Sequence, residues 1–236
     1  MKHHSAFVAI LAALALAATG CSSRSTSSNQ GKFTSNIDAV VASKAPAGTQ
    51  KWPAPAPLFA ADLANADFKP GSWAWKDGAL AGSGIIWTKA VYGDFYMSCE
   101  FRCDAGKDGG VLIRGGTEDW VNNSIEVQIA HGDRTERAIT GAIFDCLAPT
   151  RDVGIEPGKW YQYVIFAKGD RISVFIDGEQ VIKNMNLSKW TEAGKNPDGT
   201  KNKFKKAYKD LERTGRIGLQ SQGGGVQYRN IFIDPI

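Results

Sequence analysis

The sequence is short of net charge and of long apolar runs. Its 236 residues carry a formal charge of +4, with 22% charged residues. Basic residues cluster only at 201–209, where Phe204 and Tyr208 are the only aromatic residues available to stack on bases. We therefore expect no nucleic-acid partner. The apolar run at 6–19 is too short to span a bilayer with room to spare, and the chain shows no internal repeat.

The first residues read as an export signal. A basic start, MKHH, is followed by the apolar run and then by Ala18-Thr19-Gly20-Cys21. This order resembles a bacterial lipoprotein signal, in which Cys21 is acylated and becomes the mature N-terminus. A plain secretory signal and an uncleaved anchor are the alternatives. Lipid attachment at Cys21 would hold the protein on a membrane of the cell envelope, and the Ser22-Ser23 pair favours the outer membrane.

The segment after Cys21 reads as a tether. Residues 22–32, SSRSTSSNQGK, are too poor in apolar residues to fold. The stretch KWPAPAPL, which ends at Leu58, has three prolines that favour polyproline II and exclude a central strand. We expect a signal peptide at 1–20, a flexible tether at 21–57 and one folded domain at 58–236.

Cysteine is scarce, which limits disulfides. Of four cysteines, Cys99, Cys103 and Cys146 lie in the expected domain, so at most one intrachain bridge forms. Cys99 and Cys103 are four apart on an expected strand, roughly 13 Å from each other, and cannot pair. Either could meet Cys146, and three buried free thiols are equally compatible. We interpret none of them as a nucleophile or a metal ligand.

Short alternating segments separated by glycine dominate the remainder. The chain has 26 glycines and seven tryptophans, and Asp177-Gly178 is a strong hairpin signal. The expected strands are 80–88, 94–104, 109–115, 122–130, 139–145, 160–168, 171–177, 180–183, 215–221 and 226–234. This pattern predicts an all-β, two-sheet antiparallel jelly-roll sandwich. One short helix is expected near 204–212, inside the candidate segment 202–213, with an apolar stripe at Phe204, Ala207, Tyr208 and Leu211.

Three of these strands carry polar residues on one face. In SIEVQI (124–129), Glu126 and Gln128 alternate with apolar residues, and Arg114 precedes the final glycine of GVLIRG. Glu100 and Arg102 occupy the same phase of YMSCEFRC. If the strands are neighbours, these five side chains form one polar cleft. An ordinary solvated sheet face with cross-strand ion pairs is the alternative.

Loops near this surface carry the kinds of side chain that bind sugars. Trp120, Asn122 and Asn123 lie between two of the strands, and His131 and Asp133 follow the Glu126 strand. A flat ring binds the C–H face of a sugar, and amides and carboxylates bind its hydroxyls. Trp120 is as compatible with packing as with stacking, and His131 is also a common solvated turn residue.

From Leu58 to Ile236 the chain resembles the 3-keto-disaccharide hydrolase family of bacterial exported proteins. The matching segments, in order, are YGDFYMSCEFR, GGVLIRG, SIEVQI, TGAIFD, GKWYQYVI, VFIDGEQV, KAYKDLERTGRIGLQSQGG and YRNIFI. The resemblance implies a concanavalin-like jelly roll. It also implies a lyase or hydratase acting on glycosides that a separate sugar 3-dehydrogenase has oxidised at C3.

In that chemistry a base removes the acidic C2 proton, the C1 substituent leaves, and water adds to the resulting 3-keto-glucal. The resemblance makes Glu126 the candidate base, Arg114 the enolate stabiliser and Asp145 the proton donor. Gln128 and Gln220 would orient hydroxyls. Two positions depart from relatives: many carry Asp where this chain has His131, and some carry His where it has Gln222. The remaining predicted substrate contacts are Glu100, Arg102, Trp120, His131 and Gln222.

We expect no cofactor: the carboxylate surface is compatible with a divalent metal, but no spacing demands one. An ordinary retaining glucanase on this fold would need two carboxylates about 5–5.5 Å apart, but Gln128 and His131 follow Glu126 where a second carboxylate would be required. A non-catalytic carbohydrate-binding module of the envelope is the stronger alternative, because the same fold and wet aromatic surface would serve it.

Overall fold

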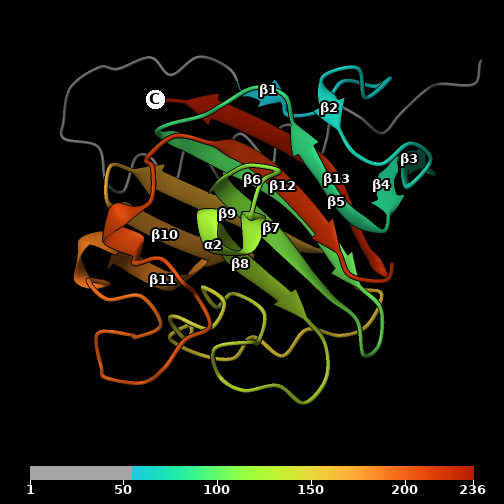
Figure 1. The fold of residues 1–236 in the computed structure, drawn as a ribbon. Coiled ribbons are helices and arrows are strands. Elements are labelled where there is room, and N and C mark those ends of the chain that lie inside the picture. The colour runs from blue at the N-terminus through green and yellow to red at the C-terminus, as the bar shows by residue number, and fades with distance from the viewer. Residues whose placement is uncertain (1–54) are drawn as a thin grey trace, which may run out of the picture.

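The alternating segments form two antiparallel sheets packed face to face, as Figure 1 shows for the computed structural model, which describes residues 55–236. The all-β sandwich expected from the sequence is confirmed. The predicted signal peptide at 1–20, Cys21 and nearly all of the predicted tether lie outside the described residues. Ala56–Pro57, just before the predicted boundary at Leu58, pair with the last strand.

The larger sheet has eight strands and the smaller sheet has five. The larger has the order β11-β10-β9-β6-β13-β4-β3, and β1 also pairs with β13. Its strands are β1 (Ala56–Pro57), β3 (Trp73–Lys76), β4 (Ala79–Gly82), β6 (Phe95–Cys103), β9 (Tyr161–Lys168), β10 (Arg171–Ile176), β11 (Glu179–Asn186) and β13 (Val226–Pro235). The smaller has the order β2-β5-β12-β7-β8. Its strands are β2 (Ala66–Asp67), β5 (Gly84–Thr88), β7 (Asp108–Gly115), β8 (Ile125–Ala130) and β12 (Arg216–Ser221).

Helical structure in the described residues is limited to three short turns. They are α2 (Trp120–Asn123), η1 (Leu187–Lys189) and η2 (Tyr208–Asp210). None of the helices between residues 55 and 236 is long and apolar enough to cross a membrane.

The core lies between the sheets and is built from every second residue of each strand. Val111, Val127 and Ile129 of the smaller sheet are fully buried, as are Phe101 and Cys99 of the larger sheet. Side chains at the intervening positions point to the outer face of each sheet, because successive side chains of a strand alternate. Cys99, Cys103 and Cys146 are buried free thiols, so neither of the disulfides left open by the sequence forms.

Two buried tyrosines join the core to the backbone of the smaller sheet. The hydroxyl of Tyr228 on β13 lies 2.6 Å from the carbonyl oxygen of Gln220 and 3.1 Å from that of Gly110. The hydroxyl of Tyr163 on β9 donates to the carbonyl of Gln128 at 2.5 Å. The outer face of β12, β7 and β8 is therefore supported from behind by the larger sheet.

The helix expected near 204–212 is present only as the single turn η2. The four residues of the predicted apolar stripe are all buried, which confirms the stripe: Phe204, Ala207, Tyr208 and Leu211. A longer helix does not form because the backbone is extended at Ala207 and at Leu211, on either side of η2. The N–H groups of Lys203, Phe204 and Lys205 donate to Asp145, Asn202 and Asn122.

Two expected strands also differ. The segment 80–88 is divided at Ser83 into β4 and β5, which belong to different sheets. The chain changes sheets between Gly82 and Gly84, and Gly84 has a φ of +85° that only glycine adopts readily. The segment 139–145 is not a strand: Ile143 alone bridges to Val127 on β8, because Gly141 and Asp145 have positive φ values and turn the backbone.

Candidate functional site

A pocket of about 650 Å³ lies on the outer face of the five-stranded sheet. Strands β5, β12, β7 and β8 form its floor. The loops after β8 and the segment before β12 supply its walls, and Figure 1 places both, in yellow-green and orange, on the lower side of the view. The lining residues are Ser83, Gly84, Ile85, Trp87, Asp108, Trp120, Glu126, Gln128, Arg134, Ala138, Phe144, Lys203, Gln220, Gln222 and Gly223.

Strand register brings the polar side chains of the floor together. Gly110 on β7 is opposite both Gln128 on β8 and Gln220 on β12. Glu126 lies two residues before Gln128 on β8, so both side chains are on the same face of the sheet. Glu126, Gln128 and Gln220 therefore project into the pocket from adjacent strands, and the buried residues between them face the core.

Glycine clears the space that these side chains occupy. A Cβ at Gly110 would lie 2.9 Å from Oε1 of Glu126, so the carboxyl group rests directly on the neighbouring strand. A Cβ at Gly218 would lie 2.8 Å from the ring of Trp87, whose indole lies across β12. Larger residues at either position would push a pocket side chain off the sheet.

The electrostatics of Glu126 suit a group that gains and loses a proton near neutrality. The side chain is half-buried, and its removal from water raises the pKa to about 7. The Lys203 ammonium opposes this rise and the Asp108 carboxylate adds to it. Glu126 is therefore partly protonated at pH 7, which is the condition a general base or acid needs.

Lys203 brings a cation into the pocket from the wall. Its Nζ lies 4.1 Å from the centre of the Phe144 ring, a cation–π distance. Its backbone N–H donates to Oδ2 of Asp145 at 2.7 Å, which fixes the loop where the side chain begins. Lys203 thus reaches the pocket from a loop that Asp145 holds in place.

Two further features of the floor and rim point to a polar ligand. Gln128 is 5% exposed, and its Oε1 has no hydrogen-bond partner among residues 55–236. A buried acceptor of this kind is normally satisfied, so this one is unusual in the fold. At the rim, Arg134 and Asp108 form an ion pair at 3.1 Å.

Comparison with known proteins identifies the family. The family described as "3-keto-alpha-glucoside-1,2-lyase-like domain" matches residues 55–234. The chain belongs to this family. No curated protein matches the chain.

Solved structures agree with this assignment. A protein from Parabacteroides distasonis, provisionally named a glycosyl hydrolase, is 34% identical, with a TM-score of 0.73 over 79% of this chain and 100% of that one. Another from the same organism, named in the same way, is 21% identical with a TM-score of 0.58, over 77% of this chain and 84% of that one. The second likeness shows the fold alone. Family membership and the first likeness support a carbohydrate-active function.

The structure brings five of the predicted site residues together in the pocket. They are Glu126, Gln128, Trp120, Gln220 and Gln222. Trp120 begins the short helix α2, which follows β7 and places the indole beside the floor. The family's polar segments SIEVQI and GLQSQGG thus meet at one site.

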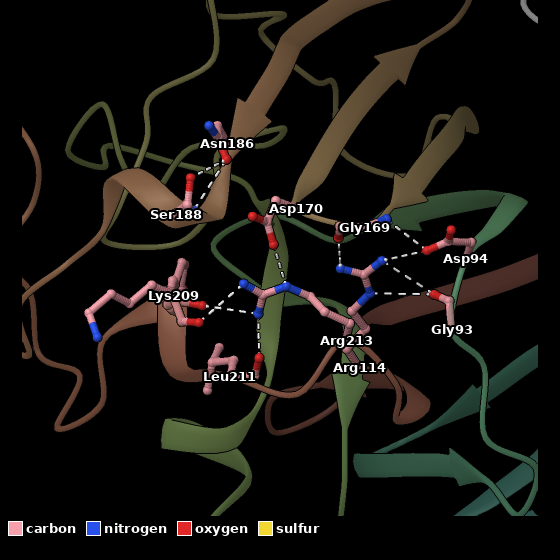
Figure 2. Close-up of polar contacts among 11 residues, drawn as sticks. Gly93, Asp94, Arg114, Gly169, Asp170, Asn186, Ser188, Lys209, Leu211 and Arg213 are labelled. Carbon is pink, nitrogen blue, oxygen red and sulfur yellow. Dashed lines mark hydrogen bonds and ion pairs between the residues drawn. The ribbon is translucent and has the colours of Figure 1, made fainter.

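Arg114 does not line this pocket. Figure 2 shows its guanidinium joining the β5–β6 loop to the β9–β10 turn: it donates to the carbonyls of Gly93 and Gly169 and pairs with Asp94 at 3.2 Å. The residue is 3% exposed. These contacts satisfy the guanidinium within the fold, so Arg114 holds loops together at the end of β7.

Glu100 and Arg102 are not part of the cleft, and the prediction of one polar surface shared with them is wrong. Both lie on β6, which belongs to the eight-stranded sheet, so their outward side chains are on the opposite side of the sandwich. Glu100 accepts from Arg229 and Asn230, and Arg102 from β6 lies over Trp160. The alternating pattern identified outward residues correctly, but it did not identify which sheet they belong to.

Asp145 and His131 also lie outside the pocket lining. Asp145 binds the backbone of Lys203, as described above. Nδ1 of His131 accepts from the N–H of Gly106 at 3.2 Å, and the ring borders a smaller depression with Asp152 and Ile155. Within residues 55–236, no group of three or more His, Cys, Asp or Glu side chains is arranged to hold a metal ion.

The pocket residues that sequence reasoning missed include Trp87, Asp108 and Lys203. Trp87 could have been predicted. It follows the buried Ile86 on β5 and so points to the outer face, and the adjacent strand β12 has glycine at position 218 on that face. Lys203 gave no such signal, because it lies on an irregular loop far along the chain from β8.

Proposed function

We propose that this protein cleaves glycosides that carry a ketone at C3, with Glu126 as the base that removes the C2 proton. The observation that carries the proposal is the position of Glu126: a half-buried carboxyl group on the floor of a sugar-sized pocket, in the family's SIEVQI segment.

The proposed reaction is an elimination. The Glu126 carboxylate takes the proton from C2, and the C2–H electrons move toward the C3 ketone to give an enolate. The enolate then re-forms the ketone, a C1=C2 double bond appears, and the C1–O bond breaks. The departing oxygen takes up the proton and leaves as an alcohol. Addition of water to the 3-keto-glucal completes a net hydrolysis.

The raised pKa of Glu126 supports this role. A ketone acidifies the adjacent C–H bond, but the proton remains a weak acid, so a base with a pKa near neutrality removes it better than an ordinary carboxylate. Burial also removes water that would otherwise compete for the carboxylate.

The other pocket groups are suited to holding a sugar ring. Trp120 offers a flat aromatic surface for its C–H face, the buried Trp87 forms part of the floor, and Gln128 and Gln220 offer amides for its hydroxyls. The Oε1 atom of Gln128 is the acceptor with an unfilled hydrogen bond. The substrate would come from a separate sugar 3-dehydrogenase, because the reaction starts from a sugar that is already oxidised.

Incubation of the full-length protein with 3-keto-trehalose, 3-keto-maltose and 3-keto-cellobiose, followed by enone absorbance, tests the proposal. We expect turnover of at least one substrate and its loss in Glu126→Gln. Glu100→Gln is the matched control, because it removes a carboxylate from the opposite sheet, and it should leave turnover unchanged. An inactive wild type that binds unoxidised glycans would instead favour a carbohydrate-binding module.

We further propose that the protein is exported and held on the outer membrane through acylated Cys21. The lipoprotein-like order of residues 1–21 supports this, and a lipid anchor would leave the catalytic domain on a tether. Mass spectrometry of the mature N-terminus tests the modification, and Cys21→Ser should release the protein from the membrane fraction. A mature chain that begins elsewhere would contradict it.

A further inference from the structure

The pocket contains two cations, and they differ in how they are paired. Arg134 forms an ion pair with Asp108 at the rim. Lys203 forms no ion pair with any of the described residues, and its ammonium instead lies over the faces of Phe144 and Phe204, with 4.1 Å and 5.7 Å to the ring centres. Lys203 is therefore the pocket cation whose charge is still available to a ligand.

Two hydrogen bonds fix the backbone that carries Lys203. The Asp145 carboxylate accepts from the backbone N–H of Lys203, and the Asn122 side chain accepts from the N–H of Lys205. The Lys203 residue is exposed, and its ammonium rests over the Phe144 ring. A charge held near the reacting atoms stabilises a transition state at little cost of reorganisation.

The charge of Lys203 is felt at Glu126, where it opposes the rise in pKa. During proton removal the negative charge leaves the Glu126 carboxylate and appears on the substrate oxygen. A cation near the carboxylate can also stabilise the negative charge on the substrate oxygen. The site then contains one anion and one cation both before and after the proton transfer. The predicted stabiliser, Arg114, cannot do this, because its donors are used within the fold.

We propose that Lys203 is a catalytic residue that donates a hydrogen bond to the C3 oxygen of the substrate and stabilises the enolate formed when Glu126 takes the C2 proton. This inference rests on the proposed function. The C2–H bond breaks, its electrons form C2=C3, and the former ketone oxygen becomes an alkoxide that Lys203 binds as a cation. With a glycoside, the proton taken up by Glu126 passes to the departing oxygen as the C1–O bond breaks; without a leaving group, it exchanges with solvent.

The test separates enolate formation from departure of the leaving group. The 3-keto derivative of 1,5-anhydroglucitol has an acidic C2 proton but no leaving group at C1, so it reports enolate formation alone. In heavy water, wild-type protein should exchange its C2 hydrogen for deuterium, measured by NMR. Lys203→Met should slow both this exchange and the elimination of a 3-keto-disaccharide by about 10²–10³-fold, and Lys203→Arg should restore much of the rate.

Lys205→Met is the matched control. It removes the same charge from the same loop, two residues further on, at an exposed side chain outside the pocket lining. It should behave as wild type. Thermal unfolding of each variant shows whether the fold is kept, and Lys203→Arg preserves the charge if the methionine variant unfolds.

Each outcome is decisive. If Lys203→Met exchanges the C2 hydrogen at the wild-type rate but fails in elimination, Lys203 protonates the leaving group and the enolate role is wrong. If it retains both rates, Lys203 is not catalytic, although the proposed function stands. If wild-type protein shows neither exchange nor elimination with any 3-keto sugar, the proposed function itself fails.

Discussion

The carboxyl group of Glu126 on β8 rests on Gly110 of the neighbouring strand β7. A Cβ at position 110 would lie 2.9 Å from Oε1 and 3.0 Å from Cγ of Glu126, and 2.8 Å from the carbonyl oxygen of Val127. The proposed base thus owes its position to the absence of a side chain on the adjacent strand.

Gly110→Ala should therefore move the carboxyl group and disable the enzyme. We expect at least a tenfold loss of kcat and a loss of about 1–3 kcal/mol in the free energy of unfolding, because the added methyl group overpacks the floor. Steady-state kinetics and denaturant unfolding measure the two effects. Gly116→Ala is the control, since nothing lies within 4 Å of a Cβ there; equal effects in both variants would contradict the steric explanation.

The activity should depend on pH through Glu126. A base with a pKa of about 7 is protonated and inactive at low pH. We expect kcat/KM to rise about tenfold per pH unit below pH 7 and to level off above it. Lys203→Arg should keep this profile, whereas loss of the cation in Lys203→Met should move the midpoint to higher pH. A profile that is flat between pH 5 and 8 would exclude Glu126 as the base.

The same pKa predicts an effect on stability. The folded-state pKa lies above the unfolded value of about 4.5, so folded protein binds more protons between these values and loses stability as pH rises through 7. Glu126→Gln removes this loss. It should match wild type at pH 4 and be more stable at pH 8, by up to about 3 kcal/mol. Urea unfolding at both pH values measures the difference, and a constant difference would show that the carboxyl group is well solvated.

Asp145 should act through Lys203 and not as a proton donor. Asp145→Asn keeps an oxygen that can accept from the Lys203 N–H, so kcat should stay within a few-fold of wild type. Asp145→Ala loses that acceptor and should lower kcat about tenfold, since a misplaced charge stabilises the transition state less well. A proton donor would show the reverse for asparagine, with a loss as large as that in alanine.

Arg114 should matter for stability and not for chemistry. Replacing it with methionine leaves Asp94 without its ion pair and the carbonyls of Gly93 and Gly169 without donors. We expect a loss of about 1–3 kcal/mol in the free energy of unfolding, because two part-buried carbonyls lose their donors while Asp94 stays partly exposed and bonded to the Gly169 N–H. The C2 exchange rate per folded molecule, measured well below the unfolding temperature, should be unchanged. A stable variant without exchange activity would return Arg114 to the catalytic role expected from the sequence.

The fold could be predicted because burial of one face of a strand produces a local pattern in the sequence. Phe101, Val111 and Val127 alternate with outward residues, and that alternation alone indicates strands with one face in a core. No local pattern indicates the sheet to which each strand belongs. Glu100 and Glu126 look alike in sequence, yet β6 and β8 lie in different sheets, so one carboxylate faces the pocket and the other faces the opposite surface.

The candidate site was predictable where it lies on strands and unpredictable where it lies on loops. Glu126, Gln128 and Gln220 are fixed by the two-residue period of β8 and β12. Lys203 reaches the pocket only because Asp145 and Asn122 bind the backbone around it, contacts between residues that are 58 and 83 positions apart. Nothing in a local pattern encodes such pairs.

The floor of the pocket is formed by strands that the core supports, and its walls are formed by loops. This difference suggests how the binding preferences of family members could diversify. Tyr163 and Tyr228 fix the strands beneath Gln128, Gly110 and Gln220 from the core side, so the reacting groups keep their spacing. Insertions in the loop after β8, near Arg134 and Ala138, would change the pocket wall without disturbing that spacing or the Asp145–Lys203 contact. Preference for one aglycone over another is thus expected to evolve separately from the capacity to break the bond.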